Sequence, residues 1–176
     1  QVISSQDSLA EQNETYAVTL TPGTGSDNAG SSFAQSTTTG TVLNDDGALT
    51  LQLDTPSVQE GSGGDIYNVQ FTVLRSGNTT GVATVDWSLS GDAATAGYFA
   101  QLTGTVEFAN GDSQQIVTLP VTPNSTQESD LTFTVTLSNA DGAQIISGAG
   151  IATGTVVDDD STVSISGLAS AIEGDS

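Results

Sequence analysis

Short stretches in which apolar and polar residues alternate are the feature that most constrains the fold of this chain. A period of two places every second side chain on one face, as in a half-buried β-strand, and no long stretch repeats apolar residues at helical spacing. Turn-forming residues such as Ser76-Gly77-Asn78 and Asn110-Gly111-Asp112 separate the stretches. Seven of them lie in the middle of the chain: Leu49–Leu53, Tyr67–Arg75, Val82–Leu89, Leu102–Phe108, Gln115–Val121, Leu131–Ser138 and Ile151–Val157.

This pattern predicts an all-β protein. About seven short antiparallel strands within about 110 residues, without cysteine, are typical of an immunoglobulin-like antiparallel β-sandwich. We expect Trp87 to anchor the core rather than to form a ligand platform. The other side chains predicted to face the core from two of the strands are Tyr67, Val69, Phe71, Val73, Val85 and Leu89.

The chain also contains an internal repeat. "ETYAVTL" from Glu14 matches "LTFTVTL" from Leu131, and "TTGTVLNDD" from Thr38 matches "ATGTVVDDD" from Ala152. A Glu-Gly pair follows each acidic run, at Glu60-Gly61 and Glu173-Gly174. Because the order of these landmarks is the same in both copies, chance does not account for it.

The repeat predicts a division into tandem modules. Residues 1–46 read as the C-terminal part of one module, residues 47–160 as a complete module, and residues 161–176 as the first strand of a following module. We therefore interpret the sequence as a segment of a larger tandem array.

Charge and composition exclude several classes of function. The chain has 21 acidic residues, one basic residue (Arg75), no histidine and no cysteine, and its formal net charge is −20. A basic patch for nucleic acid or anionic lipid cannot form, and neither can thiolate metal sites, cysteine nucleophiles or imidazole-dependent triads. No apolar run is long enough for direct membrane insertion of this segment. Cations are the expected partners, and we expect Arg75 at a surface end of its strand.

Acidic residues gather in the predicted loops. Loops that join alternate strand pairs of a sandwich lie at the same pole. Asp92 lies in the loop between the third and fourth strands, Glu128 in the loop before the sixth, and Asp158–Asp160 follow the seventh. These carboxylates should converge, and at intermediate dielectric each close pair repels by roughly 4 kcal/mol unless a cation neutralises it.

Calcium is the cation that suits such a cluster best. It accepts about six to eight oxygen ligands in flexible geometry, whereas magnesium prefers fewer protein ligands and a stricter octahedron. A set of ligands without histidine or cysteine also disfavours zinc and copper. The sequence therefore predicts a calcium site at the pole where the last strand ends.

The central module resembles the Calx-beta domain family. The resemblance lies in "VQEG" from Val58, "VDWSLSGDAATAG" from Val85, "GTVEFANGDSQQIVTLPV" from Gly104, "ESDLTFTVTLSN" from Glu128 and "GTVVDDD" from Gly154. It implies a calcium-binding β-sandwich with its ions at one pole. The residues at positions that match family ligands are Glu60, Asp92, Glu128, Asp158, Asp159 and Asp160.

The module also departs from the family pattern. Leu131 stands where the family usually has a second glutamate, and Pro123 and Asn124 stand where an acidic pair usually opens the loop. Leucine cannot coordinate an ion and asparagine offers one neutral oxygen, so we expect fewer or weaker ions here than in a full family site. Asp130 is expected to cap a loop or face water rather than bind metal.

The N-terminal fragment keeps the family pattern better than the central module does. The resemblance therefore implies a second calcium site there, with Asn44 beside its acidic ligands. Those ligands are Asp7, Glu11, Glu14, Asp45 and Asp46.

Three functions follow as hypotheses. The first is a calcium-binding tandem β-sandwich that acts as a rigid spacer or adhesive element of a large secreted or cell-surface protein. Its partners would be calcium ions, neighbouring modules of the same chain, and other surface proteins or glycans. The second is a calcium-sensing regulatory module. The third is a glycan hydrolase that uses Glu107 and Asp112 as paired carboxylates. We disfavour it because this pair flanks a predicted hairpin turn without an evident cleft. We therefore expect a protein that is not an enzyme.

Overall fold

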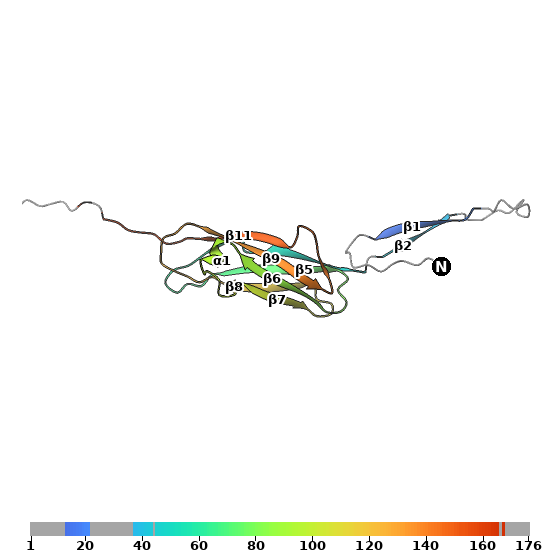
Figure 1. Cartoon of the computed structure of the whole chain (residues 1–176), viewed down its shortest axis with the longest axis horizontal. Coiled ribbons are helices and arrows are strands. Elements are labelled where there is room, and N and C mark those ends of the chain that lie inside the picture. Colours follow the sequence, from blue (N-terminus) through green and yellow to red (C-terminus); the bar gives the residue numbers. More distant parts are fainter. Residues whose placement is uncertain (1–12, 22–36, 44, 166, 168–176) are drawn as a thin grey trace, which may run out of the picture.

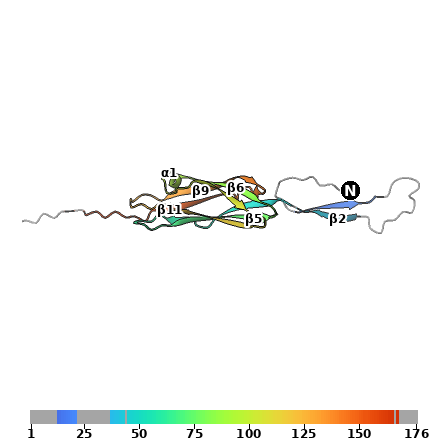
Figure 2. The same ribbon diagram turned by 90° about the horizontal axis from the view of Figure 1, so that it is seen from below.

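Two packed β-sheets form the body of the protein in the computed structural model, which describes residues 13–21, 37–43, 45–165 and 167 (Figures 1 and 2). In spatial order, the first sheet contains β10 (Gln144–Ile145), β3 (Gly47–Leu53), β5 (Asn68–Gly77) and β8 (Gln114–Pro120). The second sheet contains β4 (Ser57–Gln59), β11 (Ile151–Val157), β9 (Leu131–Asp141), β6 (Ala83–Ser90) and β7 (Thr103–Phe108).

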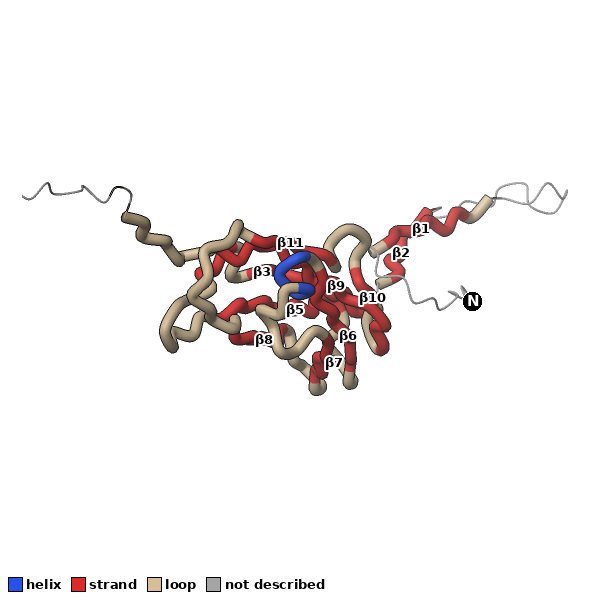
Figure 3. The backbone as a smooth tube through the Cα atoms, turned by 60° about the vertical axis from the view of Figure 1, so that its left-hand side comes forward, coloured by secondary structure: helices blue, strands red, loops and turns tan. Residues whose placement is uncertain are grey.

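The sandwich confirms the predicted fold class and all seven predicted strands. Neighbouring strands are antiparallel except for two short pairs, β10 with β3 and β4 with β11. Three short elements were not predicted: the strands β4 and β10 and the helix α1 (Asp92–Thr95, Figure 3). Asp92 begins this helix and does not lie in a simple turn. Elements of two to four residues are too short to leave a periodic pattern in a sequence.

Aromatic side chains join the two sheets. Phe71 of β5 packs edge-on against Trp87 of β6, with ring centroids 5.6 Å apart and an interplanar angle of 71°. Trp87 is buried, as predicted for a core anchor, and Val69, Phe71 and Val73 are fully buried. The prediction for Tyr67 was wrong, because its side chain is 37% exposed. The strand begins only at Asn68, so Tyr67 lies outside the alternating pattern.

Arg75 is buried, and the expectation of a surface position was wrong. It continues the inward-facing series of β5 beyond Val73, and only 3% of it is exposed. Its guanidinium donates hydrogen bonds from Nη1 to the carbonyl of Gly81 and from Nη2 to that of Thr80, at 3.1 and 3.0 Å. The buried cation thus fixes the loop that joins β5 to β6.

A separate two-stranded hairpin precedes the sandwich. It consists of β1 (Glu14–Thr19) and β2 (Thr37–Val42), which pair antiparallel with Tyr16 opposite Gly40. In the sandwich, β9 and β11 pair with Phe133 opposite Gly154. The two hairpins therefore have the same register. Each residue pair of β1 and β2 corresponds, through the sequence repeat, to a residue pair of β9 and β11; the first is Glu14 opposite Val42, which corresponds to Leu131 opposite Val156.

The chain passes through the sandwich from pole to pole. Figure 1 shows β1 and β2 beyond the end of the sandwich where β3 begins, whereas the residues after β11 leave from the opposite end. The carboxylates at the start of β3 and those after β11 therefore belong to different poles.

Candidate metal centre

Strand pairing brings Glu60 to the end of β11. The strand β4 runs parallel to β11 with Gln59 opposite Val157, and the Glu60 amide donates to the Val157 carbonyl at 3.0 Å. The next residue, Gly61, has a φ of +81°, and a Cβ there would lie 2.8 Å from the Asp65 carbonyl oxygen. The Glu-Gly pair is thus explained: the glutamate follows the strand, and only glycine fits the turn after it.

Three carboxylates converge at this pole. One carboxylate oxygen from each of Glu60, Asp158 and Asp160 lies within 4.8 Å of the other two, and they form the single group of this kind among the residues described. Glu60 is completely buried, whereas Asp158 and Asp160 are half-buried. Within the described residues, two buried oxygens lack a hydrogen-bond donor, Oε1 of Glu60 and Oδ2 of Asp160.

Backbone amides hold Asp158 in place. Its Oδ2 accepts the amide hydrogen of Glu128 at 3.0 Å, and its Oδ1 accepts that of Asp160 at 3.2 Å. The amide of Asp158 itself donates to Oδ1 of Asp130 at 3.1 Å. Asp130 therefore caps the turn, as expected, and the loop before β9 is tied to the residues that follow β11.

A polar group of three residues contacts Oε2 of Glu60 through Asn124. Nδ2 of Asn124 lies 3.1 Å from Glu60 Oε2, 3.0 Å from the Tyr98 hydroxyl and 3.2 Å from Glu128 Oε1. The Glu60 carboxylate thus has one oxygen facing this group and one oxygen without a donor.

The environment favours neutralisation of the buried carboxylate. Burial is the largest cause that raises the pKa of Glu60, a hydrogen bond with the Tyr98 hydroxyl opposes it, and the neighbouring Asp160 and Asp158 raise the pKa further. Burial likewise raises the pKa of Tyr98, and the adjacent Glu60 and Glu128 add to that effect. A negative charge at Glu60 is therefore poorly compensated by the protein itself.

The residues present fit a hard divalent cation. Buried carboxylate oxygens without donors are the unsatisfied groups that such an ion would neutralise. The donor set contains oxygen only, which suits calcium better than zinc or copper. Glu60, Asp158 and Asp160 are the side chains that would hold the ion.

The other residues predicted for this site lie outside the group. Glu128 lines the same pole through its contact with Asn124, whereas Asp92 and Asp159 are exposed. Tyr98 was not predicted as a neighbour of the site, and Asn124 only as a departure from the family pattern. No sequence signal identified Tyr98, because the fold alone carries it from the loop after α1 to Glu60.

The acids predicted for the N-terminal site are only partly described. Asp7 and Glu11 lie outside the described residues, and Glu14 begins β1 with its side chain exposed. Asp45 and Asp46 directly precede β3, whereas Glu60 lies beside the end of β11, and these two strand ends are at opposite poles of the sandwich (Figure 1). This second site therefore stays a prediction.

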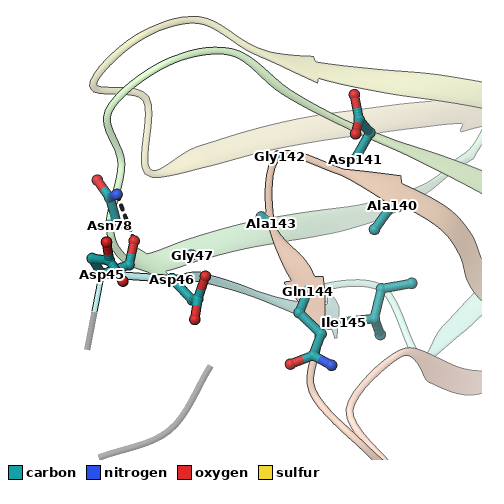
Figure 4. Close-up of a pocket in the computed structure, with 10 residues that line it drawn as sticks. All are labelled: Asp45, Asp46, Gly47, Asn78, Ala140, Asp141, Gly142, Ala143, Gln144 and Ile145. Carbon is teal, nitrogen blue, oxygen red and sulfur yellow. Dashed lines mark hydrogen bonds between the residues drawn. The ribbon is translucent and has the colours of Figure 1, made fainter. Parts of the chain in front are cut away.

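Asp45 and Asp46 line a pocket of about 440 Å³ (Figure 4). Asn78 closes one side, with its Nδ2 donating to the Asp45 carbonyl at 2.6 Å and its amide to that of Asp46 at 3.2 Å. Asp141 lies across the pocket in Figure 4. These carboxylates do not meet within coordination distance of one another in the part of the chain that is described.

Glu107 and Asp112 do not form a catalytic arrangement that the structure supports. Oδ2 of Asp112 accepts the Ala109 amide at 2.9 Å and Nε2 of Gln115 at 3.1 Å. Asp112 is therefore engaged in closing the turn between β7 and β8, while Glu107 is exposed on β7.

The helix α1, four residues long, is too short to cross a membrane, and it is the sole α-helix in the described ranges.

Comparison with known proteins identifies the family of the sandwich. The family model of the Calx-beta domain matches residues 43–160, which include the whole sandwich and all three converging carboxylates. The chain belongs to the Calx-beta family. Calx-beta domains are calcium-binding modules, and the Calx-beta resemblance found in the sequence is confirmed.

Solved Calx-beta structures are similar to this chain. One, described as the apo form of the Calx CBD1 domain, has 25% sequence identity and a TM-score of 0.53, with 65% of this chain and 98% of that one covered. Another, the calcium binding domain CBD12 of CALX1.1, has 27% identity and a TM-score of 0.51, with 59% of this chain covered. The match covers 41% of that second chain. No curated protein sequence matches the chain.

Proposed function

We propose that this protein binds calcium through Glu60, Asp158 and Asp160 and is part of a tandem array of Calx-beta modules. In this proposal the array acts as a rigid spacer or adhesive element of a large secreted or cell-surface protein. The observation that carries calcium binding is the fully buried Glu60. Its Oε1 has no donor among the described residues, and one of its carboxylate oxygens lies within 4.8 Å of oxygens from two further carboxylates. A relative described as a calcium binding domain supports the choice of ion.

The division into modules is supported by the two hairpins. In β9 the buried residues Phe133 and Val135 face the core, whereas the equivalent residues of β1, Tyr16 and Val18, are 38% and 39% exposed. Hairpin β1–β2 thus has the register of a final Calx-beta hairpin without the facing sheet. We assign residues 1–46 to the end of a preceding module and residues 161–176 to the start of the next. Val163, which is 92% exposed, is the counterpart of the buried Leu49.

The position of the site supports the role of a spacer. The chain enters the sandwich at one pole and leaves at the other, so that modules would follow one another end to end (Figure 1). An ion held by Asp158 and Asp160 lies directly before the residues assigned to the next module. It would restrict the angle between two modules and stiffen the array.

Calorimetry tests calcium binding. We expect heat of binding when calcium is added to the chelator-treated protein, and a rise in the melting temperature that grows with calcium concentration. Glu60→Gln should lose both effects at this site, whereas Glu107→Gln, a matched change on the exposed face of β7, should keep them. Absence of binding and of any shift in melting temperature would refute the proposal.

The calcium affinity separates a spacer from a sensor. A calcium-sensing regulatory module should respond at about 10⁻⁷ to 10⁻⁵ M calcium, whereas an extracellular structural module should saturate at about 10⁻⁴ to 10⁻³ M. X-ray scattering across the titration gives the second criterion. A sensor should change its arrangement of modules within the lower range.

A further inference from the structure

The amide of Asn124 lies between carboxylate oxygens at the pole that carries Glu60, Asp158 and Asp160, called the metal pole. A cation could otherwise bind at this position. Nδ2 of Asn124 lies 3.0 to 3.2 Å from three oxygens, two of which belong to the carboxylates of Glu60 and Glu128. A carboxamide nitrogen has only two hydrogens, so two of the three oxygens must share one of them. The amide is neutral, but its partly positive hydrogens face oxygens that an ion would otherwise contact.

A second hydrogen bond fixes the orientation of this amide. Oδ1 of Asn124 accepts the backbone amide of Thr126 at 2.6 Å. A rotation that exchanged Oδ1 and Nδ2 would place Oδ1 against two carboxylates and leave the Thr126 amide facing an NH₂ group. Asn124 therefore cannot offer its oxygen to an ion near Glu60 without losing four favourable contacts.

The surrounding space is large enough for more than the amide. A cavity of about 110 Å³ lies between the loop after α1 and the loop that carries Asn124, and Tyr98, Asn124 and Glu128 are among its lining residues. A single water needs only about 10–15 Å³ of such volume. Glu60 is not among the lining residues, so the cavity gives room beside Asn124 and Glu128, and the partly positive amide hydrogens lie between Glu60 Oε2 and Glu128 Oε1.

We propose that Asn124 sets the ion capacity of this pole. Its amide replaces a second cation, restricts calcium to Oε1 of Glu60 together with Asp158 and Asp160, and stabilises the loops when calcium is absent. This inference rests on the proposed calcium site and extends it. It predicts a Calx-beta module that stays folded without calcium and gains one ion when the amide becomes a carboxylate.

The test compares Asn124→Asp with the wild type. An aspartate can keep the bond to the Thr126 amide, but it removes the donor between Glu60 and Glu128 and adds a ligand. We expect one additional calcium ion per chain by isothermal titration calorimetry. In chelator, we expect a melting temperature lower by at least about 5 °C, because three acceptors lose their donor and a like charge is added.

Two control variants separate the charge from the amide. Asn110→Asp adds the same charge in the turn between β7 and β8, where Oδ1 of Asn110 accepts the Gly81 amide at 2.8 Å, an acceptor that aspartate retains. It should bind as many ions as the wild type and lose little of its melting temperature in chelator. Asn124→Ala should melt at a lower temperature in chelator without binding an additional ion.

The outcomes distinguish this inference from the function on which it rests. If the wild type binds calcium and Asn124→Asp binds the same number of ions, the inference is overturned and the proposed function stands. If the wild type binds none and Asn124→Asp binds one, the proposed function fails, whereas the exclusion of a cation by the amide is supported. If neither binds calcium, both are overturned.

Discussion

A carboxylate oxygen of Glu60 lies within 4.8 Å of one from Asp158, although most of the sandwich separates these residues in the sequence. The parallel pairing of β4 with β11 is the reason, because it ends with Gln59 opposite Val157 and places the two acids side by side. Like charges in such a position destabilise the fold unless something neutralises them. The predictions below follow from this relationship and from the packing around it.

Glu60→Gln should have opposite effects with and without calcium. Without calcium, the substitution removes a buried charge, and we expect a higher melting temperature than that of the wild type at pH 7. Because burial raises the pKa of Glu60, this difference should shrink as the pH falls towards the usual range of a carboxyl group near pH 4. With calcium, we expect an affinity at least about tenfold lower, or about 1.4 kcal/mol. Thermal denaturation in chelator and in calcium measures both; equal melting temperatures in chelator would contradict the account.

Asp86→Asn should destabilise the protein in a pH-dependent manner. The Asp86 carboxylate accepts hydrogen bonds from the Thr105 hydroxyl at 2.7 Å and from Nδ2 of Asn139 at 3.0 Å, and these bonds lower its pKa. A lowered pKa contributes stability above the pKa of the unfolded chain, about 4, which is lost as the pH falls through the folded value.

Urea denaturation at pH 7 and below pH 4 measures the effect of Asp86→Asn. The variant should be less stable than the wild type at pH 7, and the difference should shrink in acid. Glu107→Gln on the neighbouring strand β7 is the control for loss of charge. A difference that stays constant across this pH range would assign the effect to packing instead.

Gly154→Ala should destabilise the sandwich by about 1–3 kcal/mol. A Cβ at this position would overlap the ring of Phe133, which is fully buried, and would lie 3.0 Å from the Pro56 carbonyl oxygen. The ring has no room to move, and its centroid lies 5.5 Å from that of Phe99. Chemical denaturation gives the loss of free energy.

Gly40→Ala is the matched control for Gly154→Ala. A Cβ on Gly40 would lie 2.5 Å from Cζ of Tyr16, in the same cross-strand relationship. The Tyr16 ring is 38% exposed and can turn aside. We expect no change in the unfolding of the sandwich; an equal loss in both variants would contradict the packing argument.

Hydrogen exchange should distinguish the two equivalent hairpins. A two-stranded hairpin without a facing sheet is marginally stable, so that amides of β1 and β2 should exchange much faster than those of β9 and β11. If residues 1–46 complete a module that begins earlier in a longer chain, as proposed, that longer chain should protect β1 and β2 from exchange. Unchanged exchange in the longer chain would argue against that division.

The alternation of side chains was sufficient to predict the fold class and seven strands, because each strand buries one face. It failed where the burial of a residue depends on distant contacts. Arg75 continues the inward face of β5, yet it was expected at the surface. The carbonyls of Thr80 and Gly81 that accept its hydrogen bonds are positioned by the course of the β5–β6 loop, which the alternating pattern does not predict. The position of Tyr98 beside Glu60 was missed for the same reason, because the loop after α1 places it there and no local sequence pattern predicts the course of that loop.

The convergence of acidic residues at this pole was predicted in outline, and which of them bind calcium stays a prediction. The acidic run after β11 and Glu60 came from the sequence and its Calx-beta resemblance, and the structure brings Glu60, Asp158 and Asp160 together. Asp92 was predicted from the same resemblance, but it begins α1 and is exposed. Whether a loop carboxylate points at its neighbours depends on short elements such as α1 and β4, which periodicity cannot reveal.

Crystallography of the protein with calcium tests the central claim most directly. Anomalous scattering from crystals grown in calcium should show an ion about 2.3–2.6 Å from Oε1 of Glu60, with oxygens of Asp158 and Asp160 among its ligands. The same crystals of Glu60→Gln should show no ion at this position. An ion elsewhere at the pole that leaves Oε1 of Glu60 uncoordinated, or no ion at all, would contradict the account.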